Sequence, residues 1–122
     1  MVEEMVTRAN RDERLRARGK FIDLTFELGV GRDLWIIHVD KCRVAASRAG
    51  GAGAAKPQFS IRAAEDAWAD FRKPIPPPGT HDILALFEGE RLEIEGDILP
   101  LMQNLMFIKL VLDKARDTGA AQ

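Results

Sequence analysis

The side chains best suited to chemistry are two histidines, His38 and His81, and a single cysteine, Cys42. A histidine can act as a general base and a cysteine as a nucleophile, but each needs a second group that orients or activates it. His38 falls in a predicted strand, opposite the face of Trp35 and Ile37, which favours a structural, hydrogen-bonded role. Cys42 falls at a turn without an evident activator. Since no Cys or His spacing matches a metal site, we predict no enzyme activity, metal or cofactor.

Two further sequence patterns resemble functional motifs, but each has a simpler structural explanation. The glycine-rich segment 49–55 precedes Lys56 as in a phosphate-binding loop, but Pro57 stands where that motif needs Ser or Thr opening a helix. We therefore interpret 49–55 as a flexible linker. A run of carboxylates is expected on the wet side of a strand, and its last member is better explained as a helix cap. These residues are Glu88, Glu90, Glu93, Glu95 and Asp97.

Length and composition fit one globular domain. The chain has 122 residues, is 46% hydrophobic and carries a formal net charge of −1. A charge this close to zero argues against nucleic acid as a partner, because phosphate binding needs a positive excess. The charged first 20 residues do not form a signal peptide, and no apolar run is long enough to span a membrane. With a single cysteine, a reducing, cytoplasmic location is expected.

Hydrophobic periodicity places the elements that must position any site. Alternation with a period of two predicts closely spaced strands in an antiparallel meander, joined by tight turns. We expect Thr80 to cap the third helix and Asp97 the last one. The predicted strands span 21–28, 34–40, 43–47, 58–62 and 90–96, and the predicted helices span 1–19, 63–72, 81–87 and 98–116.

The first predicted helix, 1–19, has a thin apolar stripe and many charges. We expect it to lie on the surface and to fray. Its arginines form a face that is compatible with an anionic membrane, but acidic residues interleave with them, which favours a solvated helix. The stripe consists of Val2, Met5, Val6, Ala9 and Leu15.

The last predicted helix is too apolar for a single buried face. A surface helix needs an apolar stripe about 100° wide, and here apolar side chains point almost all the way round. Three covers would hide the second face: the core of the domain, a second subunit, or a cavity filled by an apolar ligand. The first is hard to arrange for the terminal helix of a short chain. Between Ile98 and Leu112 the residues that are not strongly apolar are Pro100, Gln103, Asn104 and Lys109.

The segment that leads into this helix resembles a known family. Phe87–Asp97 (FEGERLEIEGD) is similar to the glycine, basic, apolar, apolar, glycine-aspartate signature of the sterol carrier protein type 2 domain, which also precedes an apolar helix. Ile22–Phe26 and Asp33–Val39 look like the first two strands of that family. Phe59–Arg62 followed by Ala63–Trp68 looks like its strand-then-helix step. The likeness covers roughly residues 20–115.

The resemblance implies an α+β fold with a mostly antiparallel five-stranded sheet and helices packed on one face. The implied order is helix, three strands, crossover, strand, helix, strand, helix. It also implies non-catalytic binding or transfer of a sterol, fatty acyl chain or similar lipid, in a tunnel between the sheet and the C-terminal helix. By position, the candidate wall residues are Phe26, Trp35, Ile37, Leu84, Phe87, Leu101, Met102, Leu105, Met106 and Ile108.

The resemblance also orients the last helix and divides the chain. The side from Leu101 to Ile108 is expected to face the sheet and ligand. Phe107, Leu110 and Val111 are left for a homodimer or for transient membrane contact. The alternative function is accordingly a homodimeric interaction or accessory domain without a carried lipid. We expect a surface helix at 1–19, a lipid-binding region at 20–117 that forms one domain with it, and a disordered tail at 118–122.

Two departures from the family pattern stand out. A proline-rich connector at 74–78 replaces a more helical stretch of typical members. The chain also ends without the peroxisomal tripeptide of eukaryotic carriers, which points to a bacterial cytoplasmic protein.

Overall fold

A computed structural model describes residues 1–50 and 56–117, so most of the predicted linker and the whole predicted tail lie outside the described residues. The described strands form one sheet in the order β3-β2-β1-β4-β5. β1 pairs with β4 in parallel, and the other three neighbouring pairs are antiparallel, which confirms a mostly antiparallel sheet. The strands are β1 (Asp23–Val30), β2 (Asp33–Asp40), β3 (Arg43–Arg48), β4 (Phe59–Ala63) and β5 (Leu92–Gly96).

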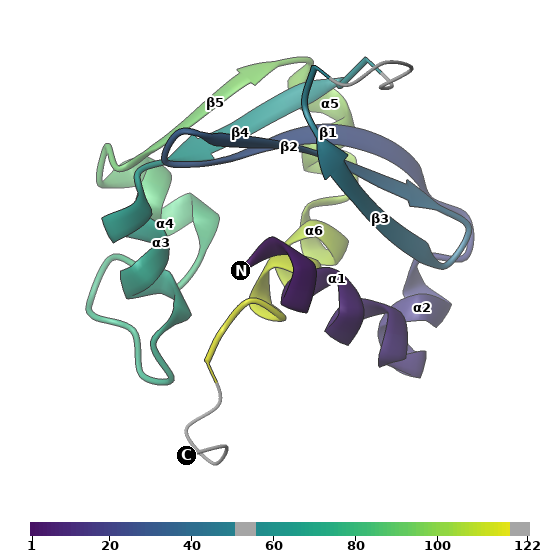
Figure 1. The fold of residues 1–122 in the computed structure, drawn as a ribbon, viewed down its shortest axis with the longest axis horizontal. Helices are drawn as coiled ribbons and strands as arrows, with labels where there is room; N and C mark the ends of the chain where they lie inside the picture. Colours follow the sequence, from purple (N-terminus) through teal and green to yellow (C-terminus); the bar gives the residue numbers. More distant parts are fainter. Residues whose placement is uncertain (51–55, 118–122) are drawn as a thin grey trace.

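Helices cover one face of this sheet (Figure 1). The alternation predicted for β1 is present: Leu24, Phe26 and Leu28 belong to the hydrophobic core, while Glu27 between them pairs with Arg62. None of the described helices is long and apolar enough to cross a membrane. The helices are α1 (Val2–Arg11), α2 (Glu13–Arg18), α3 (Glu65–Arg72), α4 (Ile83–Glu88), α5 (Ile98–Gln103) and α6 (Leu105–Asp113).

The N-terminal segment differs from the expected single surface helix. Asp12 separates α1 from α2, because its carboxylate accepts hydrogen bonds from the backbone N–H groups of Arg14 and Leu15 and so starts a second helix. The Asn10 side chain bonds both backbone groups of Val44, at 2.8 and 2.9 Å, and ties α1 to β3. The thin stripe is sufficient for burial because small and flexible residues let the helix approach closely. Its buried members are Val2, Met5, Ala9 and Leu15.

Side-chain caps explain where the later helices begin. Asp97 caps α5 as predicted, accepting a hydrogen bond from the Leu99 N–H at 3.2 Å. The predicted cap at Thr80 is wrong: Asp82 caps α4 by accepting from the Ala85 N–H, and the Thr80 hydroxyl instead donates to the Pro77 carbonyl. The carboxylate therefore starts this helix two residues later than the hydroxyl would.

Gly96 ends β5 in a conformation that only glycine adopts without strain. We therefore expect substitution of Gly96 to lower the free energy of unfolding. Its φ is +100°, and a Cβ there would lie 2.8 Å from both the Gln58 carbonyl oxygen and the Phe59 Cα. Gly79 has a similar φ of +81° but open space around it. We expect Gly96→Ala to lower the free energy of unfolding by about 2 kcal/mol more than Gly79→Ala does, measured by urea denaturation. Equal losses would mean that backbone strain, not the close approach, governs the site.

Candidate functional site

The predicted C-terminal helix is two helices, which meet at Asn104. α5 ends and α6 begins around Asn104, whose φ of −117° and ψ of 19° depart from helical values. The Pro100 carbonyl accepts hydrogen bonds from both the backbone N–H and the side-chain amide of Asn104, at 3.2 and 2.9 Å. An asparagine that bonds the backbone in this way competes with helix propagation. The buried face nevertheless continues across the break, because Leu101 of α5 and Ile108 and Leu112 of α6 are all buried at helical spacing.

α6 lies inside the domain, which corrects the expected orientation of its faces. Phe107 and Val111 were expected to be left over for a partner, but they are only 6% and 1% exposed. α6 contacts α1 and α2, and Gly19 approaches Phe107 so closely that an added Cβ would lie 2.8 Å from its ring. Of the three possible covers, the core of the domain is therefore the one found, although it was expected to be the hardest to arrange for a terminal helix. α1 and α2 make it feasible by covering the face of α6 that the sheet leaves open.

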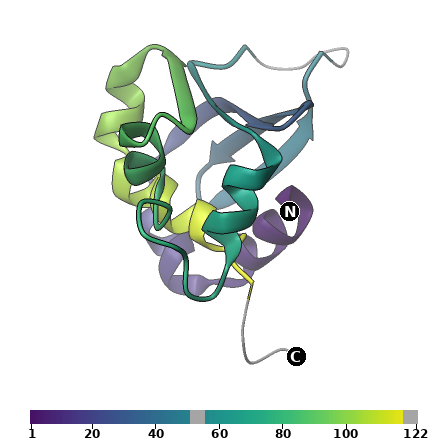
Figure 2. The ribbon, with the colours of Figure 1, turned by 90° about the vertical axis from the view of Figure 1, so that its left-hand side faces the viewer.

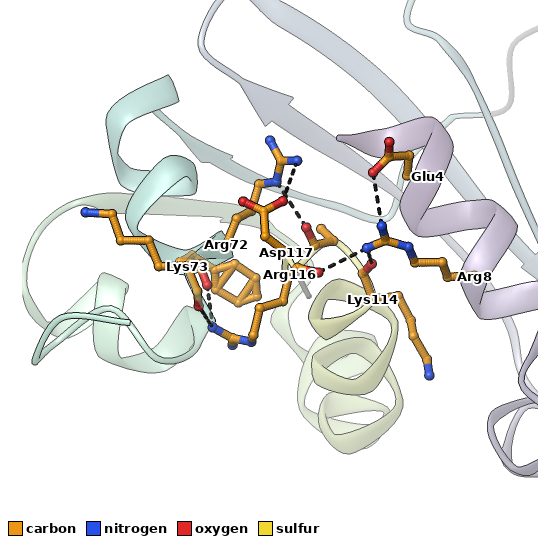
Figure 3. A network of polar contacts seen from close by, with 9 residues as sticks. Glu4, Arg8, Arg72, Lys73, Lys114, Arg116 and Asp117 are labelled. Atoms are coloured by element: carbon orange, nitrogen blue, oxygen red, sulfur yellow. Dashed lines mark hydrogen bonds and ion pairs between the residues drawn. The ribbon is translucent and has the colours of Figure 1, made fainter. Parts of the chain in front are cut away.

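A polar network fastens the C-terminal end of α6 on both sides (Figure 3). Arg8 of α1 donates to the carbonyl oxygens of Lys114 and Arg116, each at 3.0 Å. On the other side the Arg116 guanidinium lies 4.7 Å from the centre of the Phe71 ring, and it donates to the carbonyl oxygens of Phe71, Lys73 and His81. These contacts connect α1, the end of α6 and the loop between α3 and α4.

The ten predicted wall residues fall into three groups. Four are fully buried core residues: Phe26, Ile37, Leu101 and Ile108. Three are half-buried at the edge of the core: Trp35, Leu84 and Leu105. Three are exposed: Phe87 at 48%, Met102 at 53% and Met106 at 59%.

The exposed members lie on three helices that follow one another around β5. Two neighbours on α5 that periodicity did not single out are exposed as well, and we call the five side chains together the apolar rim. Figure 2 shows α4, α5 and the start of α6 along one side of the molecule. Half-buried Leu84 and Leu105 come from the same helices. The apolar rim consists of Phe87, Ile98, Leu99, Met102 and Met106.

A groove of about 200 Å³ runs between the start of α4 and the outer face of α6, with Ile83 and Met106 among its lining residues. The Lys109 ammonium lies 3.0 Å from the Asp82 carboxylate there. Burial alone would raise the pKa of Asp82, but the hydrogen bond from Ala85 and the bond and charge of Lys109 hold that pKa below its ordinary value. Asp82 is therefore ionised at neutral pH, and the ion pair joins α4 to α6.

The side chains considered for chemistry do not gather into one catalytic arrangement in the part of the chain that the structure describes. The His38 imidazole Nδ1 lies 3.4 Å from the Thr25 hydroxyl, and its Nε2 lies 3.7 Å from the Asp23 carboxylate. Cys42 is half-buried in the β2–β3 turn. Among the residues that the structure describes, no three His, Cys, Asp or Glu side chains gather in a way that would hold a metal ion.

Comparison with known proteins identifies the fold. No family model matches the sequence. No curated protein matches it either. Among solved structures, a crystal structure of sterol carrier protein 2 is similar with a TM-score of 0.68, at 17% identity over 97% of this chain and 95% of that one. A ubiquinone synthesis protein described as UbiJ-SCP2 has a TM-score of 0.62, at 19% identity over 93% of this chain and 86% of that one.

A third similar structure is a conserved hypothetical protein from Thermus thermophilus that has been suggested to be a sterol carrier protein. Its TM-score is 0.60, at 14% identity over 99% of this chain and 90% of that one. At these identities the likeness establishes the fold, which is that of sterol carrier protein 2. The resemblance carried by Phe87–Asp97 is confirmed at this level.

Proposed function

We propose that this protein binds and carries a hydrophobic ligand, such as a sterol, a fatty acyl chain or a similar lipid, without catalysing a reaction on it. The observation that carries the proposal is the apolar rim. Its five side chains are each about half exposed or more. Exposing a large apolar side chain forgoes about 1.5–3 kcal/mol, so an apolar ligand that covered several of them would gain binding energy. Similar solved structures described as sterol carrier proteins support the same class of ligand.

The proposed ligand path runs from the apolar rim into the interior. Met102 and Met106 form the entrance with Phe87, and thioether side chains adapt to irregular ligands. Leu84 and Leu105 come next, and Leu101 and Ile108 line the inner end. In this proposal the nine predicted residues other than Trp35 stay candidates for the wall, with Phe26 and Ile37 at its sheet side.

Trp35 is a weaker candidate than its neighbours. The Arg48 guanidinium lies 4.2 Å from the centre of its ring, which already gives one face of the indole a cationic partner. β2, which carries Trp35, is also separated from β5 by β1 and β4. We therefore assign Trp35 to the packing of the β2–β3 edge and not to the ligand path.

Core side chains from β1, β4 and α6 pack together beneath the sheet, so we infer that binding requires α5 to move. Phe26 and Phe59 stack at 5.2 Å between ring centres in the core beneath the sheet. α5 is short and lies between two points where the backbone changes direction, the positive φ of Gly96 and the break at Asn104. An outward shift of α5 would open the space between the sheet and α6 without unfolding either. The homodimer alternative relied on Phe107, Leu110 and Val111, of which Phe107 and Val111 are buried and Leu110 is half-buried, and we do not pursue it.

Uptake of a fluorescent fatty acid tests the proposal. We expect an environment-sensitive fatty acid probe to bind the protein, and Met102→Glu to weaken its binding about tenfold, because a carboxylate at the entrance disfavours an acyl chain. Ile75→Glu is the matched control, since Ile75 is 89% exposed but lies in the proline-rich connector. Native mass spectrometry of the gently purified protein should also find co-purified lipid. The proposal fails if neither probe nor lipid is bound, or if the control weakens binding as much.

A further inference from the structure

The groove of about 200 Å³ between α4 and α6 is apolar on its floor and polar at its edge. Phe71, Ile83 and Leu112 line the floor, come from α3, α4 and α6, and are at most 2% exposed. A groove built in this way suits an amphiphile, which has a polar head on an apolar body. The polar lining residues are His81, Asp82, Lys109 and Asp113.

The charges at the edge of this groove cancel in pairs. The Lys109 ammonium lies 3.0 Å from the Asp82 carboxylate, and the Arg116 Nε lies 2.9 Å from the Asp113 carboxylate. The side chains of Asp82 and Lys109 are only 20% and 30% exposed, so a ligand charge placed against them would lose part of its hydration. A charge that loses water and gains no partner is costly. The groove therefore disfavours a head that carries a net charge.

The pair of Asp82 and Lys109 offers both a hydrogen-bond donor and an acceptor at one point. One oxygen of Asp82 accepts from the Ala85 N–H at 2.9 Å, and the other faces Lys109. An ammonium has three N–H donors and each carboxylate oxygen has two lone pairs, so both groups have capacity for a further bond. A hydroxyl can accept from Lys109 and donate to Asp82 without breaking the pair. A carboxylate head can only accept, and it would lie beside the charge of Asp82.

The groove is continuous with the apolar rim through Met106, which belongs to both. Ligand pockets usually measure roughly 300–1,000 Å³, so a groove of about 200 Å³ has room for the head and the first part of the apolar body only. The rest of such a molecule would pass over Met106 to the entrance of the proposed ligand path.

We propose that the groove between α4 and α6 holds the head of the carried ligand, and that this head is an uncharged hydroxyl group. Lys109 donates to the hydroxyl oxygen, and the hydroxyl donates to Asp82. The pair thereby selects an alcohol over a carboxylic acid or an amine with the same apolar chain. The inference rests on the proposed lipid-carrying function and adds the chemistry of the head to it.

Competition against the fatty acid probe tests the inference with the full chain. 1-Decanol and decanoate share one chain length, and we expect 1-decanol to displace the probe from the parent protein at a lower concentration. Asp82→Asn keeps an oxygen that can accept from the Ala85 N–H and cap α4, but it leaves Lys109 as an unpaired cation. This variant should shift the preference toward decanoate at least about tenfold, measured as the ratio of the two inhibition constants.

Two further variants check the sign and the location of this effect. Lys109→Gln leaves the Asp82 carboxylate without its cation, so it should shift the same ratio in the opposite direction, away from decanoate. Asp33→Asn is the matched control, because it removes a carboxylate that lies 3.0 Å from the Arg48 guanidinium and does not line the groove. It should keep the ratio of the parent protein.

Two results would overturn the hydroxyl site. One is an Asp82→Asn variant with the same ratio as the parent, and the other is an equal shift in the Asp33→Asn control. In both cases the probe still binds, so the lipid-carrying function would stand without this head group. If the parent protein binds no probe at all, the carrying function fails and the hydroxyl site fails with it.

Discussion

Replacing Phe107 with glutamate is expected to unfold the protein, not to change its assembly. The Phe107 side chain is 6% exposed and packs against Gly19 at the end of α2. The substitution removes a buried ring, which costs about 3–5 kcal/mol when alanine replaces phenylalanine, and places a carboxylate in apolar surroundings. We expect a loss of about 5 kcal/mol or more, which approaches the whole stability of a small domain.

The neighbouring residue supplies the control. Met106 precedes Phe107 in α6 and is 59% exposed, so Met106→Glu adds the same charge to the same helix without burying it. We expect Met106→Glu to keep a cooperative urea transition close to that of the parent. Phe107→Glu should lose near-ultraviolet circular dichroism already without denaturant. A folded Phe107→Glu with half the mass by light scattering would restore the homodimer and contradict the burial described here.

The sheet and the entry to α5 could be predicted because their signals are local. Period-two alternation located β1, β4 and β5, β-forming composition located β2, and the short link after β2 located β3. Each turn residue or cap acts on the next few residues only. Asp97 illustrates this: it precedes an apolar run and caps α5 as predicted. Asp82 was missed as the cap of α4 because Thr80, two residues earlier, offers an equally suitable side chain. Only the backbone path out of the proline-rich connector distinguishes the two.

The burial of α6 could not be predicted because it depends on a partner far away in the sequence. The apolar character of the helix correctly indicated that a second face must be covered. Its cover includes α1 and α2, whose stripe of Met5, Ala9 and Leu15 is too thin to signal a core position by itself. The break at Asn104 has the same character: asparagine is tolerated within helices, and its bond to Pro100 is not encoded in the apolar period.

The residues of the candidate site could be predicted only in part, because their exposure also depends on contacts between segments that are distant in the sequence. The alternation on β1 correctly marked Phe26 as inward-facing, but it could not say whether that residue meets a ligand or another side chain. On the last helices Met102 and Met106 were expected on the inside with Leu101 and Ile108, but the structure exposes both methionines and buries the other two residues. Ile98 and Leu99 were missed as members of the apolar rim because exposure, not hydrophobicity, identifies them.

The second large effect is expected at Arg116, where one side chain joins three parts of the chain (Figure 3). Its guanidinium covers the Phe71 ring and donates to three carbonyl oxygens, that of Phe71 at the end of α3 and those of Lys73 and His81 in the loop that follows. Hydrogen bonds from charged groups contribute about 1.5–3 kcal/mol each, and partly exposed carbonyls regain some of this from water. We therefore expect Arg116→Ala to lower the free energy of unfolding by about 3 kcal/mol.

Two further variants separate geometry from charge in this prediction. Arg116→Lys keeps the charge but loses the planar fork that serves several acceptors at once, so it should recover less than half of the stability. Arg11→Ala removes an exposed arginine at the end of α1 and should change stability by less than about 0.5 kcal/mol. Urea denaturation of the three variants beside the parent measures all of these differences. If Arg116→Lys were as stable as the parent, charge alone would hold the end of α6, and the three carbonyl bonds would contribute nothing measurable.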